Sequence, residues 1–357
     1  MFKKFLTGVI AVTYACMCTG CGENAYSGLR KKDLFSNQDN LYDKIRRMDN
    51  FCQADDEHYE SAYEQFQKFD EAERKKAPEE RVVIAYEEQF PDIKGYWRDK
   101  LSDDEKKIYD RIYGAIATFN LTFKIDGVPE EEVLHKTVRS LMLDHPEFFW
   151  ISGGYLYLDR SSYTLVSFEH YNGINDEKIE KMRSSFDEET KKILDSVPKD
   201  AGDYEKALYI HDYLVKNTSY EMRYETLPNA RNELVYNAYG CIVNHKSVCE
   251  GYAEAFKYLM DRLGIEAGIT SGKSKSSGNG HAWNYICLDG DYYWIDATWD
   301  DPVSDGKDAG KVDHYYFCIT SKKLLRDHIL DDEEENLFNP ECTADKYSYS
   351  KQKKADK

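Results

Sequence analysis

The sequence predicts an α+β protein in which a mostly helical region precedes a segment that combines one helix with antiparallel strands. Two observations predict this class. Between Gly240 and Trp299, one stretch has the apolar spacing of a helix, and two alternating stretches are joined by Asp289-Gly290, a dipeptide typical of tight hairpin turns. Upstream, from Leu41 onward, apolar residues recur at the three-to-four spacing of amphipathic helices.

The length and charge of the chain limit the classes of function. Its 357 residues are enough for one large domain or two smaller ones with a hydrophobic core. The formal net charge of −18 argues against nucleic acid as a partner, because phosphate binding needs clustered lysine and arginine. The 29 tyrosines suit an extended, hydrated binding surface.

The N-terminus has the layout of a secretory signal peptide. Met1–Lys4 is positively charged, and Phe5–Met17 is an apolar run shorter than a membrane span. The following Cys18-Thr19-Gly20-Cys21 resembles the processing site of bacterial lipoproteins, although Cys18 stands where an aliphatic residue is usual. We expect residues 1–20 to be removed and Cys21 to be lipidated, which predicts an exported protein anchored to the outer face of a bacterial membrane. Ordinary secretion is the alternative.

The other cysteines show no metal-binding pattern. They are Cys52, Cys241, Cys249, Cys287, Cys318 and Cys342, and none pairs with another in a CxxC arrangement. The sequence therefore predicts neither a zinc site nor a cofactor. Export would permit disulfides, and a redox-regulated disulfide between Cys241 and Cys249 is one possibility among them.

The chain divides into five segments. A flexible polar tether is expected over 21–40, a mostly helical region with a short β-hairpin over 41–200, a core over 201–345 and a polar tail over 346–357, after the signal peptide of 1–20. Within these segments, helices are predicted over about 41–76, from the capping box Ser102-Asp103-Asp104-Glu105 onward, over 130–144, 175–196 and 203–217, and β-strands over 148–158 and 163–171.

Cys249 is predicted to lie at a helix N-terminus. The residues that follow it keep helical apolar spacing through Leu263, and Gly264 is placed to end the helix. Backbone N–H groups in a first helical turn lack intrahelical partners, and the helix dipole is positive there, so both stabilise a thiolate. Taken alone, the same pattern fits a buried structural cysteine.

The hairpin downstream places a histidine beside an aspartate. A two-residue turn at Asp289-Gly290 pairs Leu288 with Asp291, so that Trp283 faces Asp296 and His281 faces Thr298. Because side chains alternate across a strand, His281 and Asp296 share one face and are diagonal neighbours. A slip of one residue in the register would separate them.

These three residues together form a nucleophilic triad. An imidazole activates a cysteine thiol, and a carboxylate fixes the tautomer of that imidazole and stabilises its charged form. We expect Asp296 to orient His281, and His281 to take the proton of Cys249 and later deliver it to a leaving amine.

The run from about Tyr239 to Pro302, with VCEGYAEAF, GHAWN and YYWIDATWDDP, resembles the bacterial transglutaminase-like superfamily. The segments Ile210–Leu214 and His314–Phe317 look like flanking features of the same group. The resemblance covers roughly 200–345 and implies a papain-like α+β core, with the nucleophile helix packed on an antiparallel sheet that carries histidine and aspartate. It implies Cys249 as nucleophile, His281 as base and acid, and Asp296 as orienting residue.

The remaining site residues are less defined. The backbone N–H of Cys249 is the natural first donor to an oxyanion, and Asn244 is proposed as a second, with Tyr239 and His245 as alternatives. Trp283, Trp294 and Trp299 either line the substrate cleft or belong to the core.

The sequence thus predicts an exported thiol enzyme that attacks amide carbonyls of proteins or peptides, cell-wall peptides among them, through a thioester on Cys249. Water as acceptor gives a cysteine protease or deamidase, and an amine gives crosslinking; hydrolysis is favoured because water needs no dedicated site. The alternative is a surface-anchored binding or assembly module that keeps the fold without turnover.

Overall fold

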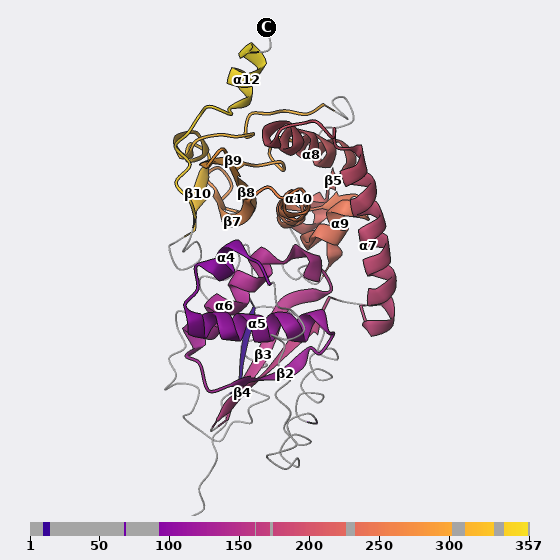
Figure 1. The fold of residues 1–357 in the computed structure, drawn as a ribbon, viewed down its shortest axis with the longest axis vertical. Helices are drawn as coiled ribbons and strands as arrows, with labels where there is room; N and C mark the ends of the chain where they lie inside the picture. The colour runs from indigo at the N-terminus through magenta and orange to yellow at the C-terminus, as the bar shows by residue number, and fades with distance from the viewer. Residues whose placement is uncertain are drawn as a thin grey trace, which may run out of the picture. The chain divides into compact units, whose positions relative to one another are not determined.

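The computed structural model describes residues 10–14, 68, 93–160, 162–171, 174–225, 233–301, 311–331 and 339–355. These residues belong to two compact units (Figure 1), with 143–150 and 171–355 in the second and the rest in the first. The expected lipidation site Cys21, the tether 21–40, Cys52 and, apart from Lys68, the helix predicted over 41–76 lie outside the described residues.

The first unit contains a four-stranded antiparallel sheet with strand order β1-β3-β4-β2. The predicted hairpin is its centre, where Leu158 of β3 pairs with Leu165 of β4. β1 comes from within the expected signal peptide and pairs with β3, while cleavage of residues 1–20 stays a prediction. The strands are β1 Ile10–Tyr14, β2 Thr122–Asp126, β3 Ile151–Asp159 and β4 Tyr163–His170.

Helix α5 of this unit lies across the sheet and begins at the predicted capping box (Figure 1). The Ser102 N–H donates to Glu105 Oε2 at 2.8 Å, and the Glu105 N–H donates to Ser102 Oγ at 3.4 Å. A cap of this kind stabilises a helix by about 1 kcal/mol, and Ile112 and Ile116 bury the inner face. The helices are α4 Tyr96–Asp99, α5 Asp103–Ala117 and α6 Glu131–Asp144, whose last two residues belong to the second unit.

The second unit has a four-stranded antiparallel sheet of order β10-β7-β8-β9, and helix α10 packs against β7 and β8 (Figure 1). The strands are β5 Ser219–Tyr220, β6 Lys246–Ser247, β7 Ala267–Ser274, β8 Gly280–Leu288, β9 Asp291–Ile295 and β10 His328–Leu330. The helices are α7 Asp176–Ser196, α8 Asp203–Asn217, α9 Ala238–Ile242, α10 Cys249–Arg262, α11 Ser321–Leu324 and α12 Tyr349–Ala355, with 3₁₀ turns at Pro146–Phe148, Met222–Glu225 and Leu234–Tyr236. The expected α+β core is confirmed.

Helix α10 begins and ends where the sequence predicts. Cys249 is its first residue, and Gly264 follows its C-terminus with φ of +75°, a backbone conformation that glycine adopts without strain. The Ile265 N–H bonds to the Met260 carbonyl and the Gly264 N–H to the Asp261 carbonyl, which is the Schellman arrangement that closes a helix.

The β8–β9 hairpin has the predicted register. Leu288 pairs with Asp291, and Asn284 pairs with Ile295 at the far end of the ladder. Asp289 and Gly290 both have positive φ, +54° and +84°, as a type I′ turn requires. The register therefore places His281 and Asp296 on the same face of the sheet.

The second compact unit extends beyond the predicted core of 201–345 on both sides, and the limits of the catalytic core itself stay a prediction. Residues 143–150 and α7 belong to the second unit, because helix α7 packs against α9 and α10. The expected polar tail also belongs to this unit: Lys346 Nζ and Tyr347 Oη both donate to Asp289 Oδ2, at 2.6 and 2.5 Å. The tail thus covers the turn of the β8–β9 hairpin.

Candidate active site

Cys249 is the first residue of α10. Gly251, two residues later, allows the first turn of this helix to pack closely on the preceding backbone. A Cβ atom at Gly251 would lie 2.0 Å from Ser247 Oγ and 2.7 Å from the Asn237 carbonyl oxygen, closer than real contacts permit. The first turn of α10 therefore packs directly on the backbone before α9. This contact fixes the place of Cys249, which is 7% exposed.

His281 lies near the start of β8, and Asp296 directly follows β9. His281 Nε2 donates to Asp296 Oδ2 at 2.7 Å, since a carboxylate can only accept. Burial lowers the pKa of His281, but the charge of Asp296, its hydrogen bond and a further hydrogen bond with Cys249 outweigh this and raise the pKa to about 10. The imidazole thus contacts the thiol and the carboxylate at once, as the triad requires.

Asp296 is fully buried and accepts three N–H groups. Besides His281, the backbone N–H of Trp299 donates to Oδ1 at 3.0 Å and His328 Nε2 donates to Oδ2 at 3.0 Å. Burial alone would raise the pKa of Asp296, but the charges and hydrogen bonds of the two imidazoles hold it well below its usual range. Asp296 therefore stays ionised and keeps His281 in the charged form.

His328 is the residue of this site that the sequence did not reveal. It lies in β10, is fully buried, and reaches Asp296 because His328 pairs with Ser274 at the edge of β7. Its ring packs on Trp299 with 4.0 Å between centroids, and its Nδ1 atom has no hydrogen-bond partner among the described residues. His328 contacts Asp296 and the ring of His281, with 5.5 Å between the two imidazole centroids, and acts on the thiol through them, so it is a positioning residue.

Replacing His328 with phenylalanine is expected to keep the aromatic packing and remove only the donor to Asp296. The lost hydrogen bond to a charged group should lower the free energy of unfolding by about 1.5–3 kcal/mol. Part of this loss is offset, because the phenylalanine no longer buries the polar Nδ1 atom. Since His328 lowers the pKa of Asp296, its loss raises that pKa, and unfolding on acidification should begin at a higher pH. Urea unfolding from pH 7 to 3 measures both effects. His328→Gln, which retains an N–H donor, should recover the acid resistance. If both variants unfold at the same pH, the hydrogen bond from His328 to Asp296 does not account for the acid resistance.

The three tryptophans have different roles. Trp283 and Trp294 are each 1% exposed, so they are core residues and cannot line an open cleft. Trp294 Nε1 donates to Ser321 Oγ at 2.9 Å. Trp299 is partly exposed and packs on His281 with 5.0 Å between ring centroids. Of the three, Trp299 alone is placed to contact a substrate beside the imidazole.

The oxyanion donor proposed at Asn244 stays a prediction. Asn244 is exposed in the turn between α9 and β6, where its backbone N–H donates to the Tyr239 carbonyl at 3.3 Å. Tyr239 packs on Phe149, with 4.9 Å between ring centroids, and is a packing residue. His245 is exposed and has φ of +53°.

The cysteines of the described residues are all free thiols. Cys241 is buried, and its Sγ lies 3.3 Å from Thr218 Oγ1. Burial raises the pKa of Cys241 to about 12, which makes it unreactive. The structure therefore does not form the Cys241–Cys249 disulfide considered from the sequence.

A helix that presents a thiol to an imidazole and a buried carboxylate on an antiparallel sheet defines a papain-like thiol-enzyme core. Residues 191–298 match the family model of the Transglutaminase-like superfamily. The chain thus contains a transglutaminase-like core, as the sequence resemblance predicted. This family relationship supports the broad class of cysteine proteases and acyltransferases.

Individual relatives share only part of the chain. The kyphoscoliosis peptidases of Homo sapiens and Mus musculus are each 27% identical over 108 residues, a match that covers 27% of this chain and 16% of each relative. A solved structure described as a TGase is 13% identical with a TM-score of 0.32, over 42% of this chain and 44% of that one.

Proposed function

We propose that this protein is an exported thiol enzyme that attacks amide carbonyls of proteins or peptides through a thioester on Cys249. The observation that carries the proposal is the continuous contact from Asp296 through His281 to Cys249 at the N-terminus of α10. A buried His–Asp pair beside a thiol is the arrangement that activates a cysteine nucleophile.

In the proposed reaction, His281 already holds the proton of Cys249 in a resting thiolate–imidazolium pair, and Sγ attacks the amide carbonyl carbon. The oxyanion that forms is stabilised by the backbone N–H of Cys249 and the positive end of α10, with Asn244 as a further proposed donor. When the tetrahedral intermediate collapses, the C–N bond breaks and His281 delivers its proton to the leaving amine. Asp296 stays ionised throughout and stabilises the imidazolium.

The thioester is then attacked by water or by an amine. Water gives a carboxylic acid and hydrolysis; an amine gives a new amide and crosslinking. We favour hydrolysis, because an amine acceptor needs a binding site of its own. With the proposed lipid anchor on Cys21, surface proteins or cell-wall peptides are the natural substrates. Among the described residues, no helix has the length and hydrophobicity to cross a membrane.

The burial of Cys249 favours a second candidate function. Cys249 has 7% of its surface exposed, and a binding module without turnover would need no more exposure than this. The two functions differ in whether a substrate acyl group ever reaches Sγ.

Capture of the acyl-enzyme separates these functions. The protein is incubated with bacterial surface extract, quenched in acid and digested, and the Cys249 peptide is searched by mass spectrometry for acyl adducts that hydroxylamine releases. We expect adducts on the wild type and none on Cys249→Ala, with Cys287, a half-buried thiol, as the internal control. Repeating the reaction in ¹⁸O water and with a fluorescent primary amine assigns the acceptor. If wild type and Cys249→Ala give the same captured adducts, the proposed enzymatic function is rejected.

A further inference from the structure

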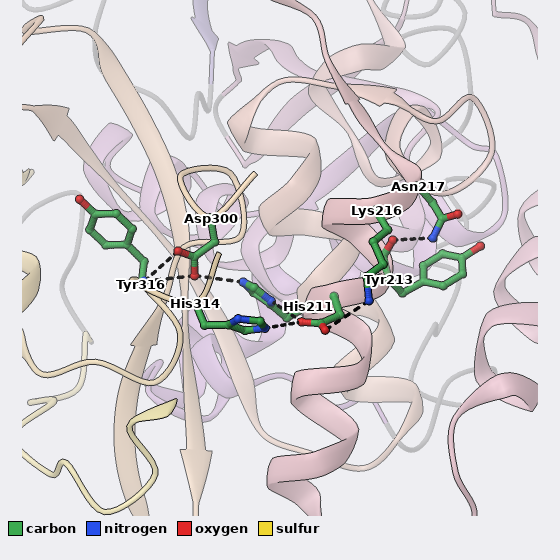
Figure 2. A network of polar contacts seen from close by, with 8 residues as sticks. His211, Tyr213, Lys216, Asn217, Asp300, His314 and Tyr316 are labelled. Carbon is green, nitrogen blue, oxygen red and sulfur yellow. Dashed lines mark hydrogen bonds and ion pairs between the residues drawn. The ribbon is translucent and has the colours of Figure 1, made fainter. Parts of the chain in front are cut away.

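A second cluster of histidine and aspartate lies apart from the triad, where α8 meets the segment before α11 (Figure 2). His314 Nε2 lies 2.7 Å from Asp212 Oδ1, and His211 Nδ1 lies 3.2 Å from the same oxygen. One ligand atom from each residue lies within 4.8 Å of the other two. The two sequence segments that flank the core, Ile210–Leu214 and His314–Phe317, therefore meet at this point.

We propose that His211, Asp212 and His314 bind a divalent transition-metal ion of the zinc class. Two imidazoles and one carboxylate are ligands that Zn²⁺ and related ions prefer. Around a tetrahedral ion with metal–ligand bonds of about 2.0–2.2 Å, neighbouring ligand atoms are separated by about 3.3–3.6 Å. The separations of 2.7 and 3.2 Å are shorter than this spacing, so the side chains must move apart, the first pair more than the second, to admit the ion.

The surroundings of His211 support this assignment. Histidine ligands usually donate their second N–H to a carboxylate, which fixes the ring and raises its basicity. His211 Nε2 lies 3.2 Å from Asp300 Oδ2, and both side chains are fully buried. Asp300 is itself held by the backbone N–H of Tyr316, which donates to both carboxylate oxygens at 2.9 and 3.1 Å (Figure 2). Asp300 thus already occupies the place of an outer carboxylate partner.

Access and charge also fit an ion. The side chains of Asp212 and His314 are 26% and 12% exposed. His314 also borders an open cavity of about 510 Å³, which gives solvent access to one side of this residue. Asp212 and the buried Asp300 supply two negative charges, and Lys216 Nζ, 3.4 Å from Asp212 Oδ2, offsets part of the first. A divalent cation would balance the remaining charge.

The triad has a similar trio, His281, Asp296 and His328, but its environment differs. All three are buried, and Trp299 packs against both imidazoles, so an ion has no open path. In the part of the chain that the structure describes, His328 Nδ1 has no counterpart of the carboxylate that His211 Nε2 contacts. We therefore expect the trio of His211, Asp212 and His314 to bind a metal ion and the trio at the triad not to bind one.

The proposed ion would join α8 to the turn that carries the catalytic carboxylate. Asp300 is four residues after Asp296, and its N–H donates to the Asp296 carbonyl at 3.2 Å. The Asp296 N–H in turn donates to the carbonyl of Tyr316, whose own N–H binds Asp300. A metal held by His211 would therefore stiffen the support of Asp296 without contacting the reacting atoms.

Metal binding to the full chain, without a histidine tag and in the Cys249→Ala background, tests the proposal. After treatment with a chelator and dialysis, the protein is titrated with Co²⁺, followed by visible absorption, and with Zn²⁺, followed by calorimetry. We expect one equivalent of each ion. His314→Gln should abolish the Co²⁺ spectrum, and Asp300→Asn should weaken affinity about 10- to 100-fold, as outer-partner substitutions do.

Two variants serve as controls. Asp313→Asn removes a neighbouring exposed carboxylate outside the trio and should bind like the parent, and His328→Gln changes only the triad trio. Circular dichroism without metal establishes that each variant is folded. The proposal is overturned if the parent binds no stoichiometric ion, if the Co²⁺ spectrum survives in folded His314→Gln, or if it disappears in His328→Gln, which would place the ion at the triad.

Discussion

Replacing His281 with alanine is expected to move the pH midpoint for alkylation of Cys249 upward by several units, toward the value of about 8.5 for an ordinary thiol. In the wild type, His281 has a pKa raised to about 10 and contacts Cys249, so the imidazolium can stabilise the thiolate far below pH 8. Without the imidazolium, only the helix N-terminus remains to favour ionisation. Rates of modification by iodoacetamide between pH 5 and 9.5, measured on the Cys249 peptide by mass spectrometry, give the midpoint.

The midpoint is a better measure than the rate at a single pH. At pH 6 a thiol of pKa about 8.5 is only about 0.3% ionised, so pairing with His281 increases the thiolate fraction several hundredfold. A thiolate of low pKa is also a weaker nucleophile, with a Brønsted coefficient of about 0.4–0.5, and this cancels much of the gain. Rates at pH 6 will therefore differ less than the midpoints do.

Cys287 provides the internal control for this experiment. It is a free, half-buried thiol whose pKa is raised, mainly by burial, so it should react only at high pH in both proteins. His170→Gln, which changes a histidine of β4 in the first unit, should leave the Cys249 profile unaltered. If wild type and His281→Ala have the same midpoint, the thiolate–imidazolium pair does not exist and the proposed mechanism fails.

The parts of the site that sequence alone predicted are those fixed by local rules. The register of β8 and β9 follows from one two-residue turn at Asp289-Gly290, so the meeting of His281 with Asp296 required only counting. The place of Cys249 follows from the helical spacing after it and from Gly264 at the helix end. Local patterning also predicted α5 through its capping box.

The parts that were not predicted depend on contacts between distant segments. His328 reaches Asp296 only because β10 pairs with the edge of β7. The strand β10 has three residues, which are too few to show the alternation that predicts a strand. The second unit extends beyond the predicted core because α7 packs on α9 and α10, which periodicity does not reveal. Alternation placed Trp283 on the face of His281, but the burial of a side chain depends on what packs above that face. Non-local packing therefore accounts for most of the differences.

Replacing Asp296 with asparagine is expected to lower the free energy of unfolding by about 3–5 kcal/mol, because removing one partner of a buried ion pair leaves the other charge uncompensated. Asp296 accepts from His281, His328 and the Trp299 backbone, and an asparagine offers one carbonyl oxygen where the carboxylate offers two. Urea unfolding at pH 7 measures the loss. Alkylation of the folded variant should show a raised Cys249 midpoint, since His281 loses the charge that keeps it protonated.

Asp301→Asn is the matched control, because it makes the same substitution five residues along the same turn. Asp301 is only partly buried and has a pKa raised mainly by burial, with one hydrogen bond from Tyr252 at 2.6 Å. It pairs with no imidazole in the described residues, so its replacement should cost about 1 kcal/mol, the value of a single hydrogen bond. A loss as large as that of Asp296→Asn would mean that the turn, and not the ion pair, is responsible.

The pH dependence of the Asp296→Asn effect identifies its cause. The folded-state pKa of Asp296 is depressed, so its ionisation stabilises the fold above the unfolded pKa of about 3.9, and this contribution declines as the pH falls below that value. The Asp296→Asn variant also removes the charge that raises the His281 pKa, a contribution that is complete below the unfolded pKa of about 6.5 and declines above it. The difference in unfolding free energy between wild type and Asp296→Asn should therefore be largest between about pH 4 and 6.5 and become smaller by pH 3. A free-energy difference that stays constant over this range would show that the packing of Asp296, and not its charge, stabilises the fold. Another group would then have to keep His281 protonated.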